Sequence, residues 1–267
     1  MRPVALTIAG SDPSGGAGVQ ADLKTFHQFG VYGEAVLTLV TVQNTCRVDS
    51  VECLNPELVL AQLQAVIEDI PPDAAKTGAL GNEALVKAIA NAAAEFRFPL
   101  VVDPVLVSKH GAALVSGNAV SALAEHLLPR AFLVTPNLHE AVLLTGMGVN
   151  DVESMRRAAR KLCGMGARAA LVKGGHLEGD AVDVLCFEGR IREFSAPRIV
   201  TRHTHGTGCT YSAAITAALS RGEPLESAVE VAKRYVSAAI ATSPGLGRGS
   251  GPLNHHSAIP EVPWKRR

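Results

Sequence analysis

Short apolar runs alternate with longer amphipathic segments along the whole chain. The short runs are rich in β-branched and aliphatic residues, which is typical of strands buried on both faces of a sheet. In the longer segments apolar residues recur every three or four positions, and this spacing predicts helices with one buried face. The predicted strands are Val4–Ala9, Ala35–Val42, Ala75–Thr77, Leu100–Val102, Phe132–Thr135, Ala169–Val172, Val182–Phe187, Arg190–Phe194 and the strand-like run Phe194–Thr201. The predicted helices are Val19–Phe29, Pro56–Ile70, Asn82–Phe96, Asn118–Leu128, Leu138–Leu144, Asp151–Met165, Thr210–Ser220 and Pro224–Thr242.

Strands separated by helices predict βαβ units with right-handed crossovers, and therefore an α/β fold with a mostly parallel sheet. Glu188 and Gly189 lie between two predicted strands and indicate a hairpin turn. The segment Gly245–Pro252 is rich in glycine and is predicted to be a loop, and Lys265–Arg267 a solvated end. No polar linker interrupts the interior, so we expect residues 1–267 to form a single domain.

Composition and charge exclude several classes of protein. Hydrophobic residues make up 47% of the chain, enough for a large core. The 25 basic and 25 acidic side chains cancel, which argues against a nucleic-acid or acidic-membrane partner. The five cysteines are odd in number and show no C-x-x-C spacing, so a disulfide framework or structural zinc site is not expected. With no signal-peptide pattern and no membrane-length apolar run, we expect a cytoplasmic protein.

The stretch from His203 to Thr210 is the first candidate for chemistry. Gly206 and Gly208 flank Thr207, so the backbone can turn sharply and approach a ligand closely. The helix that follows presents unpaired N–H groups and a positive dipole end, which together form an anion site. Cys209 lies at this helix N-terminus, where the pKa of a thiol is expected to fall. A glycine-rich turn with a buried cysteine is the alternative, and the stretch alone leaves both open.

The first loop carries a second glycine pattern. Gly16, Gly18 and Ala21 satisfy G-x-G-x-x-A between a predicted strand and helix, as in dinucleotide-binding folds. That motif also needs an acidic residue at the end of the next strand, to bind a ribose. Here that strand ends in Gln43 and Asn44, so a nicotinamide-dependent oxidoreductase is disfavoured. No G-x-x-x-x-G-K-[ST] sequence occurs, which excludes a P-loop.

Two polar residues near the first loop have both structural and functional interpretations. The planar amide of Gln43 carries a donor and an acceptor, so it can pair with an aminopyrimidine edge as amides do with adenine. Its alternative is a hydrogen bond that ties the end of the strand. Asp22 lies in the first turns of its predicted helix, where a carboxylate either offsets the helix dipole or accepts a hydrogen bond from a substrate.

Ligands of open α/β sheets bind at the carboxyl ends of the strands. Lys173 lies at such an end beside two glycines, which suits contact with a phosphate better than a solvated loop position. Asn137 and Glu140 form either a helix capping box or a pair of oxygen ligands for Mg²⁺, held through water. The histidines show no metal-ligand spacing, and His255 and His256 are assigned to the tail. The residues at predicted strand ends are Gly10, Gln43, Thr77, Asp103, Pro136, Asn137 and Lys173.

Seven motifs, taken in order, resemble one known family. They are A-G-S-D-P-S-G-G-A-G-V-Q-A-D-L-K-T-F, V-Q-N-T, K-T-G-A-L, D-P-V, T-P-N-L-x-E-A, V-K-G-G-H and T-H-G-T-G-C-T. Together they resemble the hydroxymethylpyrimidine/phosphomethylpyrimidine kinases of thiamine synthesis, within the ribokinase-like superfamily. The resemblance runs from Val4 to about Asn254. Each motif alone is weak, but the ordered set is specific.

The resemblance implies a three-layer α/β/α fold, the cofactors ATP and Mg²⁺, and often a homodimer. It places Cys209 where many relatives of the superfamily carry an aspartate base. In two positions the sequence departs from the pattern: Ala79 stands where some relatives have methionine, and His203 where asparagine is common. The implied site residues are Gly10, Asp22, Gln43, Val105 and Ala79 for the pyrimidine, Gly206, Thr207, Gly208 and Cys209 for the anion hole, Lys173, Asn137 and Thr207 for the nucleotide, and Asn137 with Glu140 for magnesium.

The expected function is ATP-dependent phosphorylation of 4-amino-5-hydroxymethyl-2-methylpyrimidine and of its monophosphate. A pyridoxal or pyridoxine kinase on the same fold is the main alternative, because both substrates are heteroaromatic rings with a hydroxymethyl group. A pyrimidine-binding protein without catalytic activity is an alternative from another class.

Overall fold

The computed structural model of the chain describes residues 2–106, 117–175, 177 and 179–259. Within these ranges the strands form one nine-stranded sheet in the order β3-β2-β1-β4-β5-β6-β7-β8-β9. The strands are β1 Val4–Ser11, β2 Tyr32–Gln43, β3 Val48–Cys53, β4 Ala74–Thr77, β5 Leu100–Val102, β6 Leu133–Val134, β7 Ala169–Lys173, β8 Ala181–Phe187 and β9 Arg190–Ala196. Every pair from β2 to β7 is parallel, while β3, β8 and β9 pair antiparallel at the two edges. The prediction of a mostly parallel sheet is confirmed.

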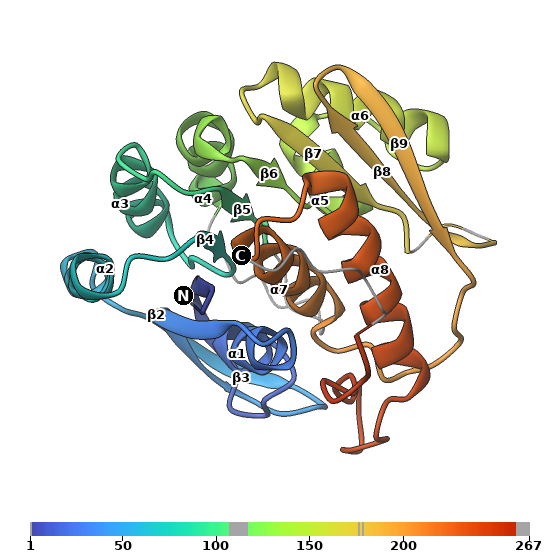
Figure 1. The fold of residues 1–267 in the computed structure, drawn as a ribbon, viewed down its shortest axis with the longest axis horizontal. Helices are drawn as coiled ribbons and strands as arrows, with labels where there is room; N and C mark the ends of the chain where they lie inside the picture. The colour runs from blue at the N-terminus through green and yellow to red at the C-terminus, as the bar shows by residue number, and fades with distance from the viewer. Residues whose placement is uncertain (1, 107–116, 176, 178, 260–267) are drawn as a thin grey trace.

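Helices cover both faces of the sheet (Figure 1). Successive strand residues point to opposite faces, so Leu6 packs in one hydrophobic core and its neighbour Ala5 in the other. The first core lies under α2 Pro56–Asp69, α3 Glu83–Ala93, α4 Gly117–Ala122, α5 Leu138–Thr145 and α6 Val152–Gly164. The second lies under α1 Gly18–Gln28, α7 Thr207–Ser220 and α8 Leu225–Ala241. This arrangement confirms the predicted three-layer α/β/α fold.

Three local predictions differ from the structure. The strand-like run Phe194–Thr201 is wrong, because β9 ends at Ala196, before Pro197, and a proline cannot donate to a sheet. The edge strand β3 was not predicted, since its polar residues hide the strand pattern. The helix predicted over Asn118–Leu128 divides into α4, a π-helical turn and the 3₁₀ turn Leu128–Arg130. Pro129 lies in that last turn and lacks the N–H that would continue an α-helix.

Helix α7 begins at Thr207, ahead of the predicted start at Thr210. Gly206 precedes it with φ of 81°, a conformation that glycine adopts at little cost. The glycine-threonine motif is therefore the first turn of the helix itself. The hairpin turn is confirmed, because Glu188 and Gly189 have φ of 50° and 76° and join β8 to β9.

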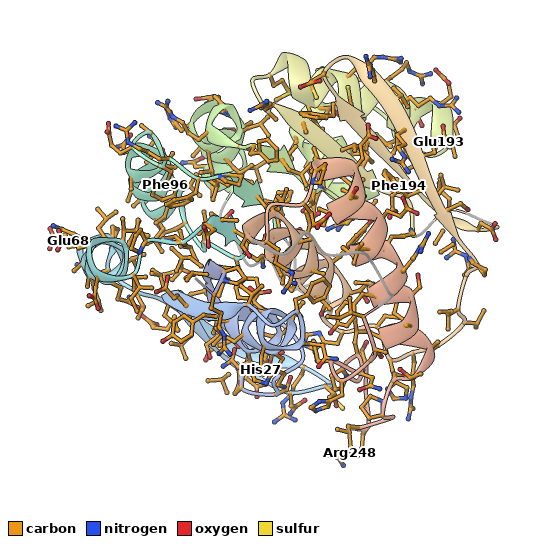
Figure 2. The ribbon with its side chains drawn as sticks, in the orientation of Figure 1. His27, Glu68, Phe96, Glu193, Phe194 and Arg248 are labelled. Atoms are coloured by element: carbon orange, nitrogen blue, oxygen red, sulfur yellow. The ribbon has the colours of Figure 1, made fainter. Side chains whose placement is uncertain are left out.

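The outer strand β9 contributes a side chain to the second core, and Figure 2 labels two of its residues. Phe194 is buried in it, while its neighbour Glu193 lies on the other face and pairs with Arg156 of α6. Of the helices that the structure describes, none has both the length and the apolar character to cross a membrane. Location in the cytoplasm stays a prediction.

Helix α8 is anchored to the sheet by a buried ion pair. Lys233 Nζ lies 2.7 Å from Asp183 Oδ2 on β8, and both side chains are at most 10% exposed. Asp183 Oδ1 also accepts a hydrogen bond from the N–H of Gly174 at 3.0 Å. The adjacent residue Arg234 makes only an exposed pair with Glu230, one helical turn away.

Lys233→Met should destabilise the protein by about 3–5 kcal/mol, because it leaves the Asp183 carboxylate buried without its cation. Arg234→Met is the matched control and should cost less than about 0.5 kcal/mol. Urea unfolding measures both, as a shift of the midpoint at constant m-value. Equal midpoints for the two variants would contradict the anchoring role.

Candidate active site

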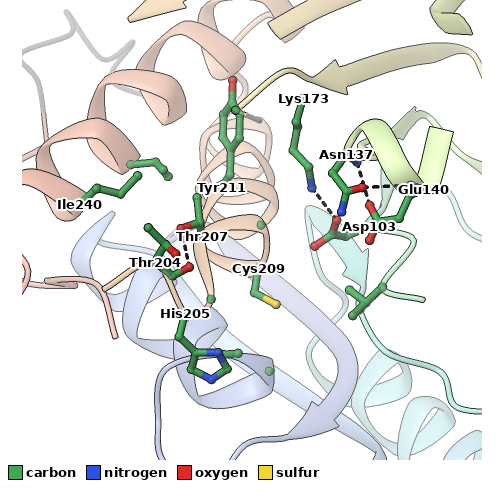
Figure 3. Close-up of a pocket in the computed structure, with 18 of the residues that line it drawn as sticks. Asp103, Asn137, Glu140, Lys173, Thr204, His205, Thr207, Cys209, Tyr211 and Ile240 are labelled. Carbon is green, nitrogen blue, oxygen red and sulfur yellow. Dashed lines mark hydrogen bonds and ion pairs between the residues drawn. The ribbon is translucent and has the colours of Figure 1, made fainter. Parts of the chain in front are cut away.

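A cavity of about 860 Å³ opens at the carboxyl ends of the parallel strands, beside the N-terminus of α7 (Figure 3). Most residues that the sequence analysis singled out line this cavity. They are Gly10, Gln43, Ala79, Val105, Asn137, Glu140, Lys173 and the four residues Gly206–Cys209. Asp22 does not line it, and the structure therefore separates this residue from the others.

The first turn of α7 has two amides available for a ligand. The N–H of Thr207 donates to Thr204 O at 3.3 Å, and its hydroxyl donates to the same oxygen at 2.8 Å. The first intrahelical bond runs from Thr210 N–H to Gly206 O. The amides of Gly208 and Cys209 are thus left without an intrahelical acceptor, which makes them the anion-binding part of the motif.

Lys173 lies directly over this turn. A Cβ added to Gly208 would sit 3.3 Å from Lys173 Nζ, so glycine gives the ammonium group room beside the helix end. Lys173 Nζ also donates to Asp103 Oδ1 at 3.0 Å. Asp103 was expected only as a residue at a strand end, and the structure makes it a partner of Lys173. Burial opposes ionisation of Asp103, but Lys173 and Lys76 hold the pKa of its carboxyl group below the usual value.

Asp22 forms a buried ion pair beneath the cavity. Its Oδ2 accepts from Lys76 Nζ at 2.8 Å and from Thr7 Oγ1 at 2.6 Å, and the side chains of Asp22 and Lys76 are fully buried. Lys76 lines the cavity, so Asp22 acts on it through Lys76. Burial raises the pKa of Asp22, against the opposing charge of Lys76. The sequence analysis missed Lys76, although the K-T-G motif contains it.

The expectation that the helix N-terminus lowers the pKa of Cys209 is wrong. Burial raises the pKa of this thiol to about 12, and the Lys76 ammonium group opposes that rise only in part. Asp22 and Asp103 add negative charge nearby and raise the pKa further. The thiol is therefore neutral at physiological pH.

Asn137 and Glu140 form the capping box of α5. Glu140 N–H donates to Asn137 Oδ1 at 2.9 Å, and Asn137 N–H donates to Glu140 Oε2 at 2.8 Å. Glu140 is only 6% exposed, and burial raises the pKa of its carboxyl group to about 7 while Lys173 opposes the rise. The capping interpretation is confirmed, and both side chains still line the cavity.

The candidate pyrimidine pocket lies at the β1–β2 end of the cavity. Among the described residues the Gln43 side chain has no hydrogen-bond partner, so it does not tie the end of β2. Gly10 packs so closely on Leu39 that an added Cβ would lie 2.4 Å from Leu39 Cδ1. The backbone of Ala79 is fixed by a 2.6 Å hydrogen bond from Thr38 Oγ1 to its carbonyl. Gly10 and Ala79 therefore form a fixed wall beside the amide of Gln43.

The opposite end of the cavity combines apolar side chains with charged ones, among them Arg198 and Lys233. Figure 3 shows Ile240 on the far side of Thr207 from Lys173 and Asp103. The apolar lining residues at this end are Pro197, Ile199, Val200, Val236 and Ile240. The cavity thus has a pocket with the polar amide of Gln43 at one end and a pocket with apolar side chains at the other. The Lys173 ammonium group and the amides of Gly208 and Cys209 lie between the two pockets.

Two contacts near α7 were not anticipated. Asp12 and His205 form a buried pair, with 2.8 Å between Asp12 Oδ2 and His205 Nε2. His255, assigned to the tail from the sequence, is buried instead, with Nε2 3.1 Å from Thr210 Oγ1. Burial opposes ionisation of Asp12, yet hydrogen bonds from His205 and Ser14 bring the pKa of its carboxyl group to about 2.

Comparison with known proteins identifies the family. A family model described as phosphomethylpyrimidine kinase matches residues 12–254. The chain is 51% identical over 263 residues to a thiamine biosynthesis bifunctional protein of Geobacter sulfurreducens, covering 98% of this chain and 54% of that protein. It is 47% identical over 259 residues to a hydroxymethylpyrimidine/phosphomethylpyrimidine kinase of Streptomyces coelicolor, covering 97% of this chain and 96% of that protein.

A solved structure shares the fold as well. It is an ADP complex of Bacillus subtilis pyridoxal kinase, which is 38% identical, with a TM-score of 0.89 over 96% of this chain and 98% of that chain. The chain spans about half the length of the Geobacter protein and nearly the whole of the other two. The family model and the relatives agree along nearly the entire sequence, and the chain belongs to the phosphomethylpyrimidine kinase family.

Proposed function

We propose that the protein transfers the γ-phosphoryl group of ATP to 4-amino-5-hydroxymethyl-2-methylpyrimidine, and then to its monophosphate. The observation that carries this proposal is the arrangement of one cavity. The amides of Gly208 and Cys209, with Lys173 above them, lie between a pocket that presents the Gln43 amide and an apolar pocket. The name of the Streptomyces relative supports the same substrate, and the name of the Geobacter relative supports a place in thiamine biosynthesis.

The acceptor pocket suits an aminopyrimidine. Gln43 offers a donor and an acceptor on one planar group, which matches a ring nitrogen beside an exocyclic amine. Gly10, Ala79 and Val105 complete the wall around it. We assign the pocket of Ile199, Val200 and Ile240 to the adenine of ATP, because an apolar slot suits the faces of a purine.

Transfer then depends on positioning and on charge neutralisation. The Gly208 and Cys209 amides, together with the Lys173 ammonium group, are placed to bind the negative charge of the transferring group. Thr207 and Asn137 line the same space and complete the nucleotide contacts. These contacts serve both reactions, because the transferring γ-phosphoryl group is the same in each.

Magnesium fits the carboxylates beside Lys173. Glu140 is a buried oxygen donor, and burial raises the pKa of its carboxyl group although the Lys173 ammonium group opposes that rise. Both side chains take part in the capping box, but only Glu140 can carry a negative charge, so Glu140 is the stronger ligand of the pair, acting through water as Mg²⁺ sites usually do. A bound Mg²⁺ would neutralise charge that develops on the phosphate oxygens.

The two acceptors differ in their need for a base. The hydroxymethyl group must lose a proton, whereas the monophosphate is already ionised at neutral pH. Cys209 lies at the helix end and is the candidate acceptor of that proton. It can accept the proton only as a thiolate, so its own proton must first pass to solvent, which requires that the cations bound with ATP lower the raised pKa of this thiol.

Phosphorylation of pyridoxal is the second candidate function, because the Bacillus subtilis protein that shares the fold is named a pyridoxal kinase. A coupled assay of ADP release, run with the pyrimidine alcohol, its monophosphate and pyridoxal, separates the two. Release that depends on both pyrimidines and exceeds that with pyridoxal supports the main proposal. Turnover of pyridoxal alone would replace it.

We also propose that the single kinase domain forms a homodimer. Val40 and Val42 lie on one face of β2, beyond the bulge in its pairing with β1, and are 41% and 55% exposed, which leaves an apolar surface near the sheet edge. Light scattering coupled to size-exclusion chromatography measures the mass. A monomer at micromolar concentration would contradict this part of the proposal.

Cys209→Ala should reduce phosphorylation of the alcohol far more than phosphorylation of the monophosphate. The physical reason is that only the alcohol needs a proton acceptor, and a general base contributes about 10²–10⁴-fold. The measurement is kcat for each substrate in wild type and variant. Equal losses on both would show that the thiol only shapes the anion hole.

Gln43→Ala should lower kcat/KM for the pyrimidine alcohol by one or two powers of ten, which corresponds to roughly 1–3 kcal/mol for a bidentate amide contact. Any activity on pyridoxal should change much less, because that ring does not present the same donor–acceptor edge. Parallel losses on the two rings would show that Gln43 supports the pocket without reading the pyrimidine. Gln43→Glu keeps the size of the side chain and serves as the control for volume.

A further inference from the structure

A buried contact joins two loops that are 193 residues apart in the sequence. Asp12 follows β1, and His205 precedes α7; they are 1% and 5% exposed. Their facing atoms, Asp12 Oδ2 and His205 Nε2, lie 2.8 Å apart. The carboxyl group of Asp12 is ionised at neutral pH and can only accept, so His205 Nε2–H is the donor.

The Asp12 carboxylate also builds the loop that carries it. Oδ1 accepts from the N–H and the hydroxyl of Ser14, at 2.8 and 2.7 Å. Oδ2 accepts from the N–H groups of Gly16 and Ala17, at 3.1 and 2.8 Å. The loop of residues 12–17 is thus organised around one carboxylate, and His205 binds to that same group.

The two loops are in direct backbone contact beside this pair. A Cβ added to Gly206 would lie 1.7 Å from Gly16 O and 3.2 Å from Ala17 Cα. A Cβ on Gly16 would lie 2.6 Å from His205 Cδ2. No side chain fits between the loops, so the start of α7 has one position relative to residues 12–17.

A third segment closes the other side of His205. The backbone N–H of His205 donates to Gly251 O at 3.1 Å, and His205 forms a parallel bridge with Pro252. Figure 3 shows the His205 ring pointing away from Lys173 and Asp103, so the ring does not face the phosphate-binding end of the cavity. Asp12 and His205 also line the cavity, and the orientation of the ring makes His205 suited to orienting the helix end.

We propose that the Asp12–His205 contact is a positioning element, which holds the amides of Gly208 and Cys209 in register with the acceptor pocket. The proposal rests on the phosphoryl-transfer function above. Gly10, a wall of that pocket, comes just before the loop of residues 12–17, so the contact links the acceptor side to the phosphate side. In-line transfer needs the reacting atoms about 3–3.5 Å apart, and a misplacement of about 1 Å can cost about 100-fold in rate.

His205→Leu removes the donor and should lower kcat by about 10- to 100-fold, while the KM values for the pyrimidine and ATP stay within about twofold. His205→Gln carries an amide N–H near the place of Nε2 and should restore kcat to within about threefold of wild type. His27→Leu is the matched control, because His27 is exposed on α1, and it should leave the kinetics unchanged.

The same contact is tested from its other end by Asp12→Asn. If the two residues act as one unit, the double variant Asp12→Asn/His205→Leu loses no more kcat than the more affected single variant. Hydrogen exchange of the amides in residues 203–209, measured without substrates, should be faster in His205→Leu and near wild type in His205→Gln. Exchange in β1 and β4 should not change.

Equal kcat losses in His205→Leu and His205→Gln would overturn the proposal, and so would a change confined to KM or additive losses in the double variant. If His205→Leu does not fold, Asp12→Asn and His205→Gln carry the test, since only the former should raise exchange at residues 203–209. Hydrogen exchange is measured without substrates, so it tests the positioning role whether or not the protein is active. A wild-type protein inactive on all acceptors would thus contradict the proposed function alone, and unchanged exchange in the variants would contradict the positioning role alone.

Discussion

Buried ionisable groups of alternating sign form the constraint on which the site depends. Asp22, Lys76, Asp103, Lys173 and Glu140 follow one another across the carboxyl ends of the strands, with contacts of 2.8 Å for the first pair and 3.0 Å between Asp103 and Lys173. Moving a single ion into a protein interior costs several kcal/mol unless a partner compensates it. The charges of Asp22 and Lys76, and those of Asp103 and Lys173, therefore compensate each other, which holds the two pairs in place.

This row of charges also accounts for binding of a phosphate at this edge of the cavity. Lys173 lies between two carboxyl groups at the edge of the cavity, and the first turn of α7 brings its amides alongside. Three carboxyl groups face two ammonium groups, and Glu140, at the end of the row, has a pKa of about 7. A site of this kind accepts a metal cation with an anionic ligand more readily than either alone, which matches the demands of phosphoryl transfer from a nucleotide.

Most of the fold followed from the sequence, because strand and helix patterns depend on neighbouring residues. The alternation of Ala5 and Leu6 between two cores is one case, and the capping box of Asn137 and Glu140 is another. The pKa of Cys209 could not be predicted in this way. The local argument from the helix N-terminus was sound, but burial outweighs it, and the charges that act on the thiol come from Lys76, Asp22 and Asp103, which are distant in sequence. For the same reason the contact between Asp12 and His205 could not be predicted from the sequence, which shows only that each residue lies in one of the family motifs.

Proton release on nucleotide binding tests the charge row most directly. Calorimetric titration with Mg²⁺·ADP, in buffers of different ionisation enthalpy, gives the number of protons released by wild type and by Glu140→Gln. At pH 6 a carboxyl group with a pKa of about 7 holds its proton, and the bound cation should expel it. Wild type should then release close to one proton more than the variant at pH 6, about half a proton more at pH 7, and almost none at pH 8.5. Equal proton release by both proteins at pH 6 would contradict the account.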